Sequence, residues 1–569
     1  MRSRRCGLIF GIIILCSSSY GLEDSPIVSL PGLGILRGRT IQTAWTHRDV
    51  HQFVDVKYGE SPTGENRFKP PLPVNSWDGI RDATKNGLGC PSILSLDDLA
   101  VHAESIDIED CLSLTISTRN LTGKQPVMVY IHGEYLFEGN NLEAPPDYLL
   151  EKDVVLVVPQ YRLGPFGFLS TMTNEIPGNA GVFDIILALH WIQTFIPHFG
   201  GDPDSITLFG QVGGAAIAHL LTFSPVVPKN LFHRVIYHSG SALMPIFLSS
   251  QPTKFTRDIA ARSGCRSKNI DTLNKCLKTI PAIDVLRGFY KHAQENIPEG
   301  VGSYGGVQFT VGGPSGVLPQ NPSTMVHMNK NNSYPAMGGA PRNAGTRAMK
   351  EIFEVDFSGA IPDEIYSGVD YINHITLQSV GLDDRRLMTA YLTKKIFTLD
   401  MIKNGTFRAM LPGLVDLAGT LLHKSSVLYA LQRNAKFLPN KTFLYTFDYK
   451  GQYNRYPDFD ADFDVKTPFT AGVSLTDENI YLFPYPDHVQ NLNAIDVEVA
   501  KKMVDMWTSF AKNGVPTVSD NLQWPPMDNQ NGPYLKINEP ISVGQNYFDE
   551  FAATVRDEAK GISIAKKDI

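Results

Sequence analysis

The sequence has little positive charge, little cysteine and few long hydrophobic runs, and each shortage excludes a class of protein. It holds 51 lysines and arginines against 58 aspartates and glutamates, a formal net charge of −7. No Lys/Arg-rich stretch follows the N-terminus, which excludes nucleic acid as a partner. Beyond residue 21 no apolar run approaches the roughly 20 residues that span a bilayer, so we expect no membrane span in the mature chain. No Cys/His spacing resembles a zinc site, and no metal or cofactor is expected.

The first 21 residues are the exception to this shortage of apolar runs. MRSRRCGLIFGIIILCSSSYG contains three arginines, an apolar run and small residues at Ser19 and Gly21. The pattern is typical of a secretory signal cleaved after Gly21, and the alternative of an uncleaved anchor requires a longer apolar run. Cleavage takes the charge to −10 (−7 minus 3). Residues 22–569 show no linker and no break in composition, so we predict one secreted, extracellular domain.

Two of the six cysteines lie in the predicted signal, which leaves Cys90, Cys111, Cys265 and Cys276. Four cysteines in an oxidising compartment predict two disulfides, for which three pairings are open. The sequence-local pairing joins Cys90 to Cys111 and Cys265 to Cys276. It closes two short loops, each worth roughly 2–4 kcal/mol of stability.

Asn-x-Ser/Thr triplets support the same compartment. They begin at Asn120, Asn331, Asn404 and Asn440. A single triplet often arises by chance, but four behind a secretory signal predict a glycoprotein.

Short apolar, β-branched segments alternate with segments of helical spacing. Strands are predicted at 126–133, 153–161 and 204–210, and helices at 181–196 and 213–223. This alternation predicts an α/β protein with a mostly parallel sheet covered by helices on both faces. Chemistry in such a sheet lies at the carboxyl ends of the strands.

The stretch LFGQVGG at 208–214 reads as a sharp turn from a strand into a helix. Gly210, Gly213 and Gly214 provide positions without side chains where the two elements nearly touch. Hydrolases mount a nucleophilic serine on such a turn, but the tip here holds Val212, which can neither attack nor donate a proton. An ordinary glycine-rich turn is the alternative interpretation.

Longer stretches surround this turn. They are 58–92, EDCLSL at 109–114, QYRLGPFGFLS at 160–170, 178–210, LFHRVIYHSGSA at 231–242 and WTSFAKNGVP at 507–516. Together they resemble the type-B carboxylesterase and cholinesterase family from about residue 27 to about residue 550. The resemblance implies an α/β-hydrolase fold with a mostly parallel central sheet. It also implies the local disulfide pairs, beside EDC and after SGSA.

Members of this family hydrolyse esters with a serine, a glutamate and a histidine in that chain order. The serine position of the family's G-x-S-x-G is Val212 in this chain. The glutamate position falls on Ala344 in YPAMGGAPRNAG, and the histidine position on Leu475 in GVSLTDENIYLF. All three are apolar, so the resemblance implies a protein that is not an enzyme.

The oxyanion loop departs from the family as well. HGEYLFEG at 132–139 keeps Gly133 but has Glu134 and Tyr135 where the family has glycines with bare N–H groups. A carboxylate would repel a developing oxyanion, and both side chains should fill part of the pocket mouth.

A displaced catalytic group would have to meet its partner at ~2.6–3.2 Å and be oriented by a third group. The candidates are His219, His238, Ser239 and His488. We interpret each as a structural or surface residue.

We therefore predict a secreted, non-catalytic, carboxylesterase-like glycoprotein that acts as a binding or adhesion domain. It is similar to the glutactin, neurotactin and neuroligin-like members of the family. The residues Gly and Gln that precede the serine position are similar to those of insect juvenile-hormone-esterase-like sequences. The partner would be an extracellular protein. One alternative is a carrier for a lipophilic small molecule in the former gorge, and another is a residual ester hydrolase.

The resemblance also implies a homodimer through C-terminal helices. Helical spacing places Val499, Met503, Met506, Trp507 and Phe510 on one face of 497–510. In 546–555 it places Phe548, Phe551, Ala552 and Val555 together. The alternative is that both faces pack on the sheet.

Overall fold

The computed structural model describes residues 25–556, with gaps at 94, 103–104, 250, 297–306, 329–332, 356–371, 373–393, 456–469, 485–491, 519–521 and 529. The predicted signal peptide, Asn331 and His488 lie outside the described residues.

The centre of the fold is an 11-stranded sheet of order β16-β15-β14-β13-β10-β9-β7-β8-β6-β4-β3. Pairing is parallel from β8 through β7, β9, β10, β13 and β14 to β15, and antiparallel at the two ends. The prediction of a mostly parallel sheet is confirmed. Its strands are β3 (Arg39–Gln42), β4 (Asp49–Lys57), β6 (Ser113–Thr118), β7 (Gln125–Ile131), β8 (Val155–Pro159), β9 (Gly201–Gln211), β10 (Arg234–His238), β13 (Ala336–Pro341), β14 (Thr442–Phe447), β15 (Tyr534–Ile537) and β16 (Ser542–Gly544).

Two smaller sheets lie outside it. One contains β1 (Ile27–Leu30), β2 (Gly34–Arg37) and β5 (Ile80–Asp82), and the other pairs β11 (Leu248–Ser249) with β12 (Phe309–Thr310).

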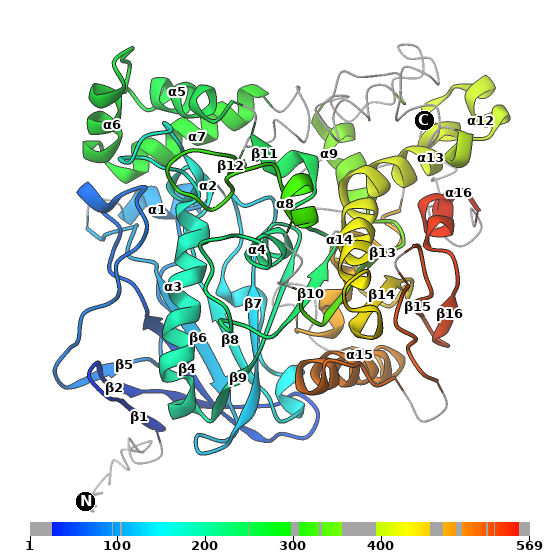
Figure 1. The fold of residues 1–569 in the computed structure, drawn as a ribbon, viewed down its shortest axis with the longest axis horizontal. Helices are drawn as coiled ribbons and strands as arrows, with labels where there is room; N and C mark the ends of the chain where they lie inside the picture. Colours follow the sequence, from blue (N-terminus) through cyan, green and yellow to red (C-terminus); the bar gives the residue numbers. More distant parts are fainter. Residues whose placement is uncertain are drawn as a thin grey trace, which may run out of the picture.

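Helices cover both faces of the central sheet (Figure 1). Alternate residues of β7 enter two different hydrophobic clusters, because successive side chains of a strand point to opposite faces. Val127, Val129 and Ile131 pack in the cluster that contains α3 (Ala180–Phe195) and α4 (Gly213–Leu221). Met128 and Tyr130 pack in the cluster that contains α15 (Ala494–Asn513).

Within the described residues the remaining α-helices are α1 (Leu96–His102), α2 (Gly164–Phe168), α5 (Pro252–Arg262), α6 (Ile270–Thr279), α7 (Ala282–Asn296), α8 (Pro322–Met328), α9 (Thr346–Val355), α12 (Leu399–Asn404), α13 (Phe407–Gly419), α14 (Ser425–Ala435) and α16 (Ala553–Arg556). A π-helical turn, Thr420–Lys424, joins α13 to α14.

Both sequence-local disulfides are present. Cys90 is bonded to Cys111 and Cys265 to Cys276, with sequence separations of 21 and 11 residues. This outcome confirms the pairing that spacing left open and that the family resemblance implied.

The apolar face of α15 packs on the sheet. Val499, Met503, Met506, Trp507 and Phe510 are at most 3% exposed within this one chain. A dimer through this face would have to remove them from the core, so α15 offers no dimer surface of the predicted kind. In the second predicted segment Phe551 is buried, whereas Phe548, Ala552 and Val555 are half-buried.

Among the described residues, one helical stretch has the length and hydropathy to cross a membrane. It is Ala180–Phe199, in which an 18-residue window has mean hydropathy 1.4 and is 61% buried inside the protein. Its place against the sheet is that of a core helix.

Candidate functional site

The turn between β9 and α4 has the backbone of a nucleophile elbow. Val212 sits at its tip with φ 44° and ψ −100° and is completely buried. A β-branched residue with positive φ is strained, typically by about 1–3 kcal/mol. The backbone N–H of Val212 donates to the carbonyl of His238 at 2.9 Å, and its own carbonyl accepts from Ala216 N at 2.9 Å. The tip is therefore held firmly but carries no hydroxyl.

The glycines of this elbow are required by close packing. A Cβ on Gly214 would lie 1.9 Å from the carbonyl oxygen of Ile131, and one on Gly210 would lie 2.6 Å from the carbonyl carbon of Gly214. A Cβ on Gly213 would lie 2.9 Å from Leu136 N. The sharp turn thus brings β9 and α4 against β7 and the loop that follows it.

Ala344 and Leu475 lie in two loops that are hydrogen-bonded to each other. Ala344 follows β13, Leu475 precedes the 3-10 turn Asp477–Tyr481, and both are completely buried. Asn343 N donates to the Val473 carbonyl at 2.9 Å, and Val473 N donates to Asn343 Oδ1 at 2.9 Å. That these residues occupy the family's glutamate and histidine positions stays a prediction.

The loop 132–139 combines positive φ angles with buried, bulky side chains. Gly133, Tyr135 and Leu136 have φ of 127°, 45° and 67°. Glu134 and Tyr135 are each 5% exposed, and Leu136 is completely buried. The Tyr135 ring stacks on Phe137 at 6.3 Å between centroids.

The Glu134 carboxylate belongs to a buried polar network. Gln211 Nε2 donates to Glu134 Oε1 at 3.2 Å, and Arg455 Nη2 lies 3.5 Å from the same oxygen. Arg455 Nη1 donates to Gln211 Oε1 at 2.7 Å, and Nη2 lies 3.5 Å from Glu143 Oε2. Burial raises the pKa of Glu143, while Arg455 opposes that rise.

His238 has a structural environment. Trp507 Nε1 donates to its Nε2 at 2.8 Å, and its Nδ1 lies 2.9 Å from Asn479 Oδ1, which assigns the proton to Nδ1. Burial lowers its pKa to about 4, so the ring is neutral at physiological pH. Both ring nitrogens are engaged, and neither contacts a serine hydroxyl.

The other described candidates are structural as well. Ser239 Oγ donates to Glu478 Oε1 at 3.4 Å, and Tyr445 OH donates to the same oxygen at 3.3 Å. Burial raises the pKa of Glu478 to about 7. His219 is buried with its ring edge-to-face against Phe223, and burial lowers its pKa to about 3.

The whole-chain comparison is decisive for the family. Residues 24–555 match the family described as "Carboxylesterase family". The chain belongs to this family. Membership of this family implies the α/β-hydrolase fold, and the mostly parallel 11-stranded sheet agrees with that fold.

Relatives of this carboxylesterase-family chain include both glutactin and esterases. It is 33% identical over 526 residues to glutactin of Drosophila melanogaster. The aligned region covers 91% of this chain but only 50% of glutactin. It is 28% identical over 542 residues to esterase FE4 of Myzus persicae, covering 92% and 91% of the two chains. Over 499 residues it is 28% identical to juvenile hormone esterase of Tribolium castaneum, covering 85% and 83%. The chain thus spans half of glutactin and most of each esterase.

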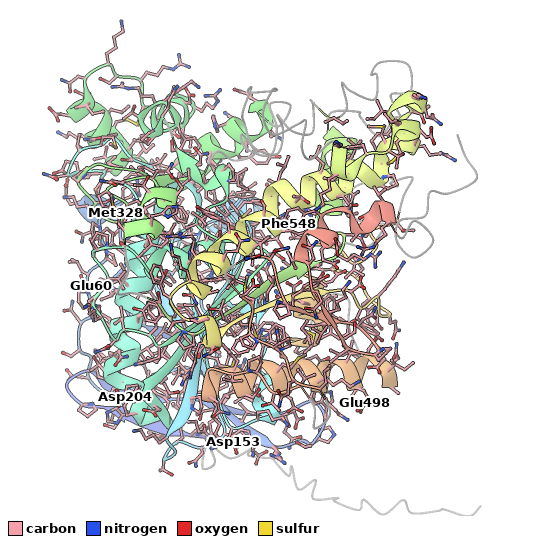
Figure 2. The ribbon with its side chains drawn as sticks, turned by 45° about the vertical axis from the view of Figure 1, so that its right-hand side comes forward. Glu60, Asp153, Asp204, Met328, Glu498 and Phe548 are labelled. Atoms are coloured by element: carbon pink, nitrogen blue, oxygen red, sulfur yellow. A yellow bond between two sulfur atoms is a disulfide. The ribbon has the colours of Figure 1, made fainter. Side chains whose placement is uncertain are left out.

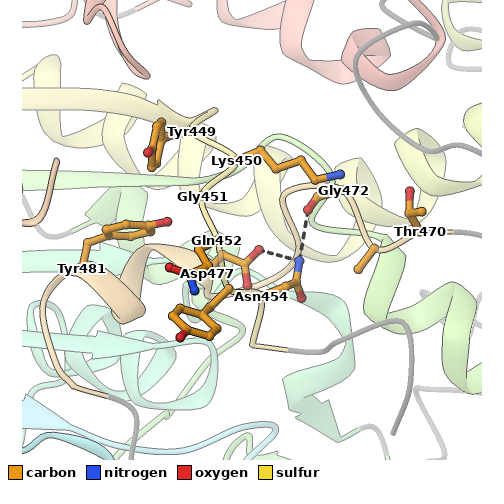
Figure 3. Close-up of a pocket in the computed structure, with 11 residues that line it drawn as sticks. Tyr449, Lys450, Gly451, Gln452, Asn454, Thr470, Gly472, Asp477 and Tyr481 are labelled. Carbon is orange, nitrogen blue, oxygen red and sulfur yellow. Dashed lines mark hydrogen bonds between the residues drawn. The ribbon is translucent and has the colours of Figure 1, made fainter. Parts of the chain in front are cut away.

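An open cleft of about 360 Å³ is lined by residues of 449–454, 470–472, Asp477 and Tyr481 (Figure 3). Among these residues Asn454 Nδ2 donates to the Gly472 carbonyl at 3.0 Å and to Asp477 Oδ2 at 2.9 Å. The lining residues are Tyr449, Lys450, Gly451, Gln452, Tyr453, Asn454, Thr470, Ala471, Gly472, Asp477 and Tyr481. Val212, Ala344 and Leu475 are not among them, so this cleft is separate from the positions that the family resemblance predicts to be catalytic.

Sequence reasoning missed Arg455, Gln211 and Asn479. Only Glu134 gave a signal, because a carboxylate predicted to be buried needs a cation or hydrogen-bond donors nearby. No group of three or more His, Cys, Asp or Glu residues suited to a metal ion occurs within the described part of the chain.

Proposed function

We propose that the protein is a non-catalytic, extracellular member of the carboxylesterase family that binds a partner protein through its outer surface. The observation that carries this proposal is Val212 on an otherwise intact elbow. An alkyl group cannot be activated by a base, so the acyl-enzyme step has no nucleophile. Restoring the elbow would not be enough, because Glu134 and Tyr135 occupy the loop that must donate hydrogen bonds to an oxyanion.

Several features support an extracellular location. The N-terminal signal pattern, the two disulfides and the asparagine triplets all fit an oxidising secretory route. Asn120, Asn404 and Asn440 are exposed, as glycan attachment requires. Thr122 Oγ1 donates to Asn120 Oδ1 at 3.0 Å, and Thr406 Oγ1 donates to Asn404 Oδ1 at 3.0 Å. Glycosylation at these positions remains part of the proposal.

The outer surface is the region available for a partner. Asp153, Asp204 and Glu498 are exposed and lie around the periphery of the molecule (Figure 2). The net charge of −7 for the full chain favours a partner that presents a basic face. The alternative is a carrier that retains a lipophilic ligand above Val212 and Leu475. Both side chains are completely buried, so neither presents surface that a ligand entering from solvent could contact.

The first test is chemical. Purified mature protein should not hydrolyse short-chain aryl esters and should not be labelled by a phosphonate that traps activated serines, with an active family esterase as the positive control. Stoichiometric labelling of any serine would contradict the proposal by revealing a displaced nucleophile.

The second test concerns the partner. The tagged, secreted protein is presented to its own extracellular fluid, and captured proteins are identified against a heat-denatured control. Thermal stabilisation by hydrophobic ligands without protein capture would favour the carrier instead. Light scattering at micromolar concentration tests the predicted homodimer, and a monomer would remove it.

A further inference from the structure

Arg455 is a buried cation that joins three separate segments. It is 7% exposed, and its backbone N–H donates to Asp477 Oδ1 at 2.8 Å. Its guanidinium reaches Gln211, which precedes the elbow tip, at 2.7 Å. It also lies 3.5 Å from Glu134 and 3.5 Å from Glu143, both in the chain that follows β7. Arg455 therefore ties the elbow to the oxyanion loop through its side chain and to the turn after Leu475 through its backbone N–H.

We propose that Arg455, with Glu134, Glu143 and Gln211, is a latch that holds the former substrate chamber closed. This inference rests on the proposed function and deepens it. If the latch stays closed, a ligand cannot enter the former substrate chamber, which also lacks a nucleophile. A carrier role is then excluded.

The latch holds down a loop that covers the elbow. Leu136 in this loop is completely buried. It packs so closely on Gly213, the residue after the tip, that a Cβ on Gly213 would lie 2.9 Å from the Leu136 backbone N. Tyr135 and Phe137 extend the cover, with Tyr135 6.4 Å from Phe247 and Phe137 6.4 Å from Phe289 between ring centroids. Val212 beneath this cover has no exposed surface.

The electrostatics explain why the arginine matters. Two buried carboxylates near one cation are tolerated because the cation compensates both. Without it, Glu134 and Glu143 would repel each other and gain hydration by turning toward water, which would pull the loop off the elbow. Tyr161 OH still donates to the His132 carbonyl at 2.8 Å and anchors the start of the loop. Loss of the latch should therefore loosen the loop without unfolding the sheet.

A thiol at the elbow tip reports whether the chamber is closed. The four cysteines of the predicted mature chain are all in disulfides, so Val212→Cys supplies a single free thiol. Val101→Cys is the matched control, because Val101 is 77% exposed on α1. In native protein we expect Ellman's reagent to label Val212→Cys at least about 100-fold more slowly than Val101→Cys, since labelling must wait for local opening. Both thiols should react equally in urea.

Breaking the latch should open the chamber. Adding Arg455→Met to Val212→Cys should speed labelling at least about tenfold, because it removes the cation that closes the loop. Arg48→Met, at an exposed arginine, should leave the rate unchanged. If Arg455→Met does not fold, the charge-neutral variant Arg455→Met/Glu134→Gln/Glu143→Gln is measured, and it should label faster too because the tie between the segments is gone.

Two results would overturn the inference. Labelling of Val212→Cys as fast as Val101→Cys would show an open chamber. An unchanged rate in a folded latch variant would show that Arg455 does not close it. Neither result touches the proposed absence of catalysis, which is judged separately by ester turnover and phosphonate labelling of the unmutated protein.

Discussion

The elbow at 208–214 and the oxyanion loop at 132–139 lie at the carboxyl ends of the neighbouring strands β9 and β7, yet they compare differently with what the family resemblance predicts. The elbow has three glycines, with Val212 where the resemblance predicts the serine. The loop has bulky residues, Glu134 and Tyr135, where the family resemblance predicts glycines. Both retain positive φ at their tips.

Packing explains the difference. Each elbow glycine faces backbone atoms within 3 Å of where its Cβ would stand, so the fold itself requires it. The side chain of Glu134 instead lies 3.5 Å from the Arg455 guanidinium, and the Tyr135 ring packs against Phe137 and Phe247. On the proposed function, a glycine needed for packing is kept when catalysis is lost, whereas a glycine that served only catalysis can be replaced.

Variants designed to restore ester hydrolysis test most directly whether the elbow and the oxyanion loop differ in this way. The triple variant Val212→Ser/Ala344→Glu/Leu475→His should remain nearly inactive, because the side chains of Glu134 and Tyr135 still obstruct the oxyanion loop. Adding Glu134→Gly and Tyr135→Gly should raise ester turnover by about 10²–10³-fold over the triple variant. The measurement is aryl-ester hydrolysis by both variants under the same conditions. Family-level turnover by the triple variant would show that Glu134 and Tyr135 do not obstruct the site.

Adding a methyl group to the elbow tests the packing half of the argument. Gly214→Ala should destabilise the protein by about 3 kcal/mol or prevent secretion, because the Cβ would overlap the Ile131 carbonyl. Gly89→Ala is the control, since its nearest neighbour would be 3.7 Å away, and it should be close to neutral. Chemical denaturation of both variants gives the free energies. Equal stability would mean that the elbow can relax and that its glycines are not required.

The contrast also shows what the sequence alone could reveal. The predicted elements at 126–133, 204–210 and 181–196 appear as β7 (Gln125–Ile131), β9 (Gly201–Gln211) and α3 (Ala180–Phe195), because hydrophobic periodicity is a local signal. Their positions, together with the disulfides, needed no tertiary knowledge beyond the family resemblance.

The polar network could not be predicted in the same way. Arg455 meets Gln211 across 244 residues, and Trp507 meets His238 across 269. Arg455 stands in no motif. Trp507 begins the stretch WTSFAKNGVP at 507–516, but neither that motif nor periodicity reports which distant side chains share a buried site. His238 could therefore be proposed as a displaced catalytic group from sequence, and only its two ring contacts identify it as structural.

A third prediction extends the comparison from packing to charge. Burial raises the pKa of Glu478, which accepts hydrogen bonds from Ser239 and Tyr445, from 4.5 to about 7. The folded protein therefore binds this proton more tightly than the unfolded chain, and between those pH values stability falls as pH rises. Glu478→Gln should remove that fall, on the order of 1–3 kcal/mol across the interval.

The measurement is denaturant unfolding of both proteins from pH 4.5 to pH 7. The lowered pKa of His238, about 4, destabilises the protein as pH falls below 6.5, but it affects wild type and variant alike and cancels in their difference. Parallel stability curves would show that Glu478 is ionised throughout the interval.

The smallest effect tests the strain that both tips share. Val212 has φ 44°, so a glycine there should be more stable than an alanine by about 1 kcal/mol, because a Cβ is unfavourable in that conformation. Val129, equally buried in β7, provides the matched pair. In an ordinary strand conformation alanine should exceed glycine by roughly 0.5–1 kcal/mol, because glycine loses more backbone entropy on folding. Comparing glycine with alanine at each site removes the common loss of the valine side chain, so the order should invert between the two positions. The same order at both, with alanine more stable, would mean that position 212 has relaxed out of its positive φ, and that the strain does not persist in the variants.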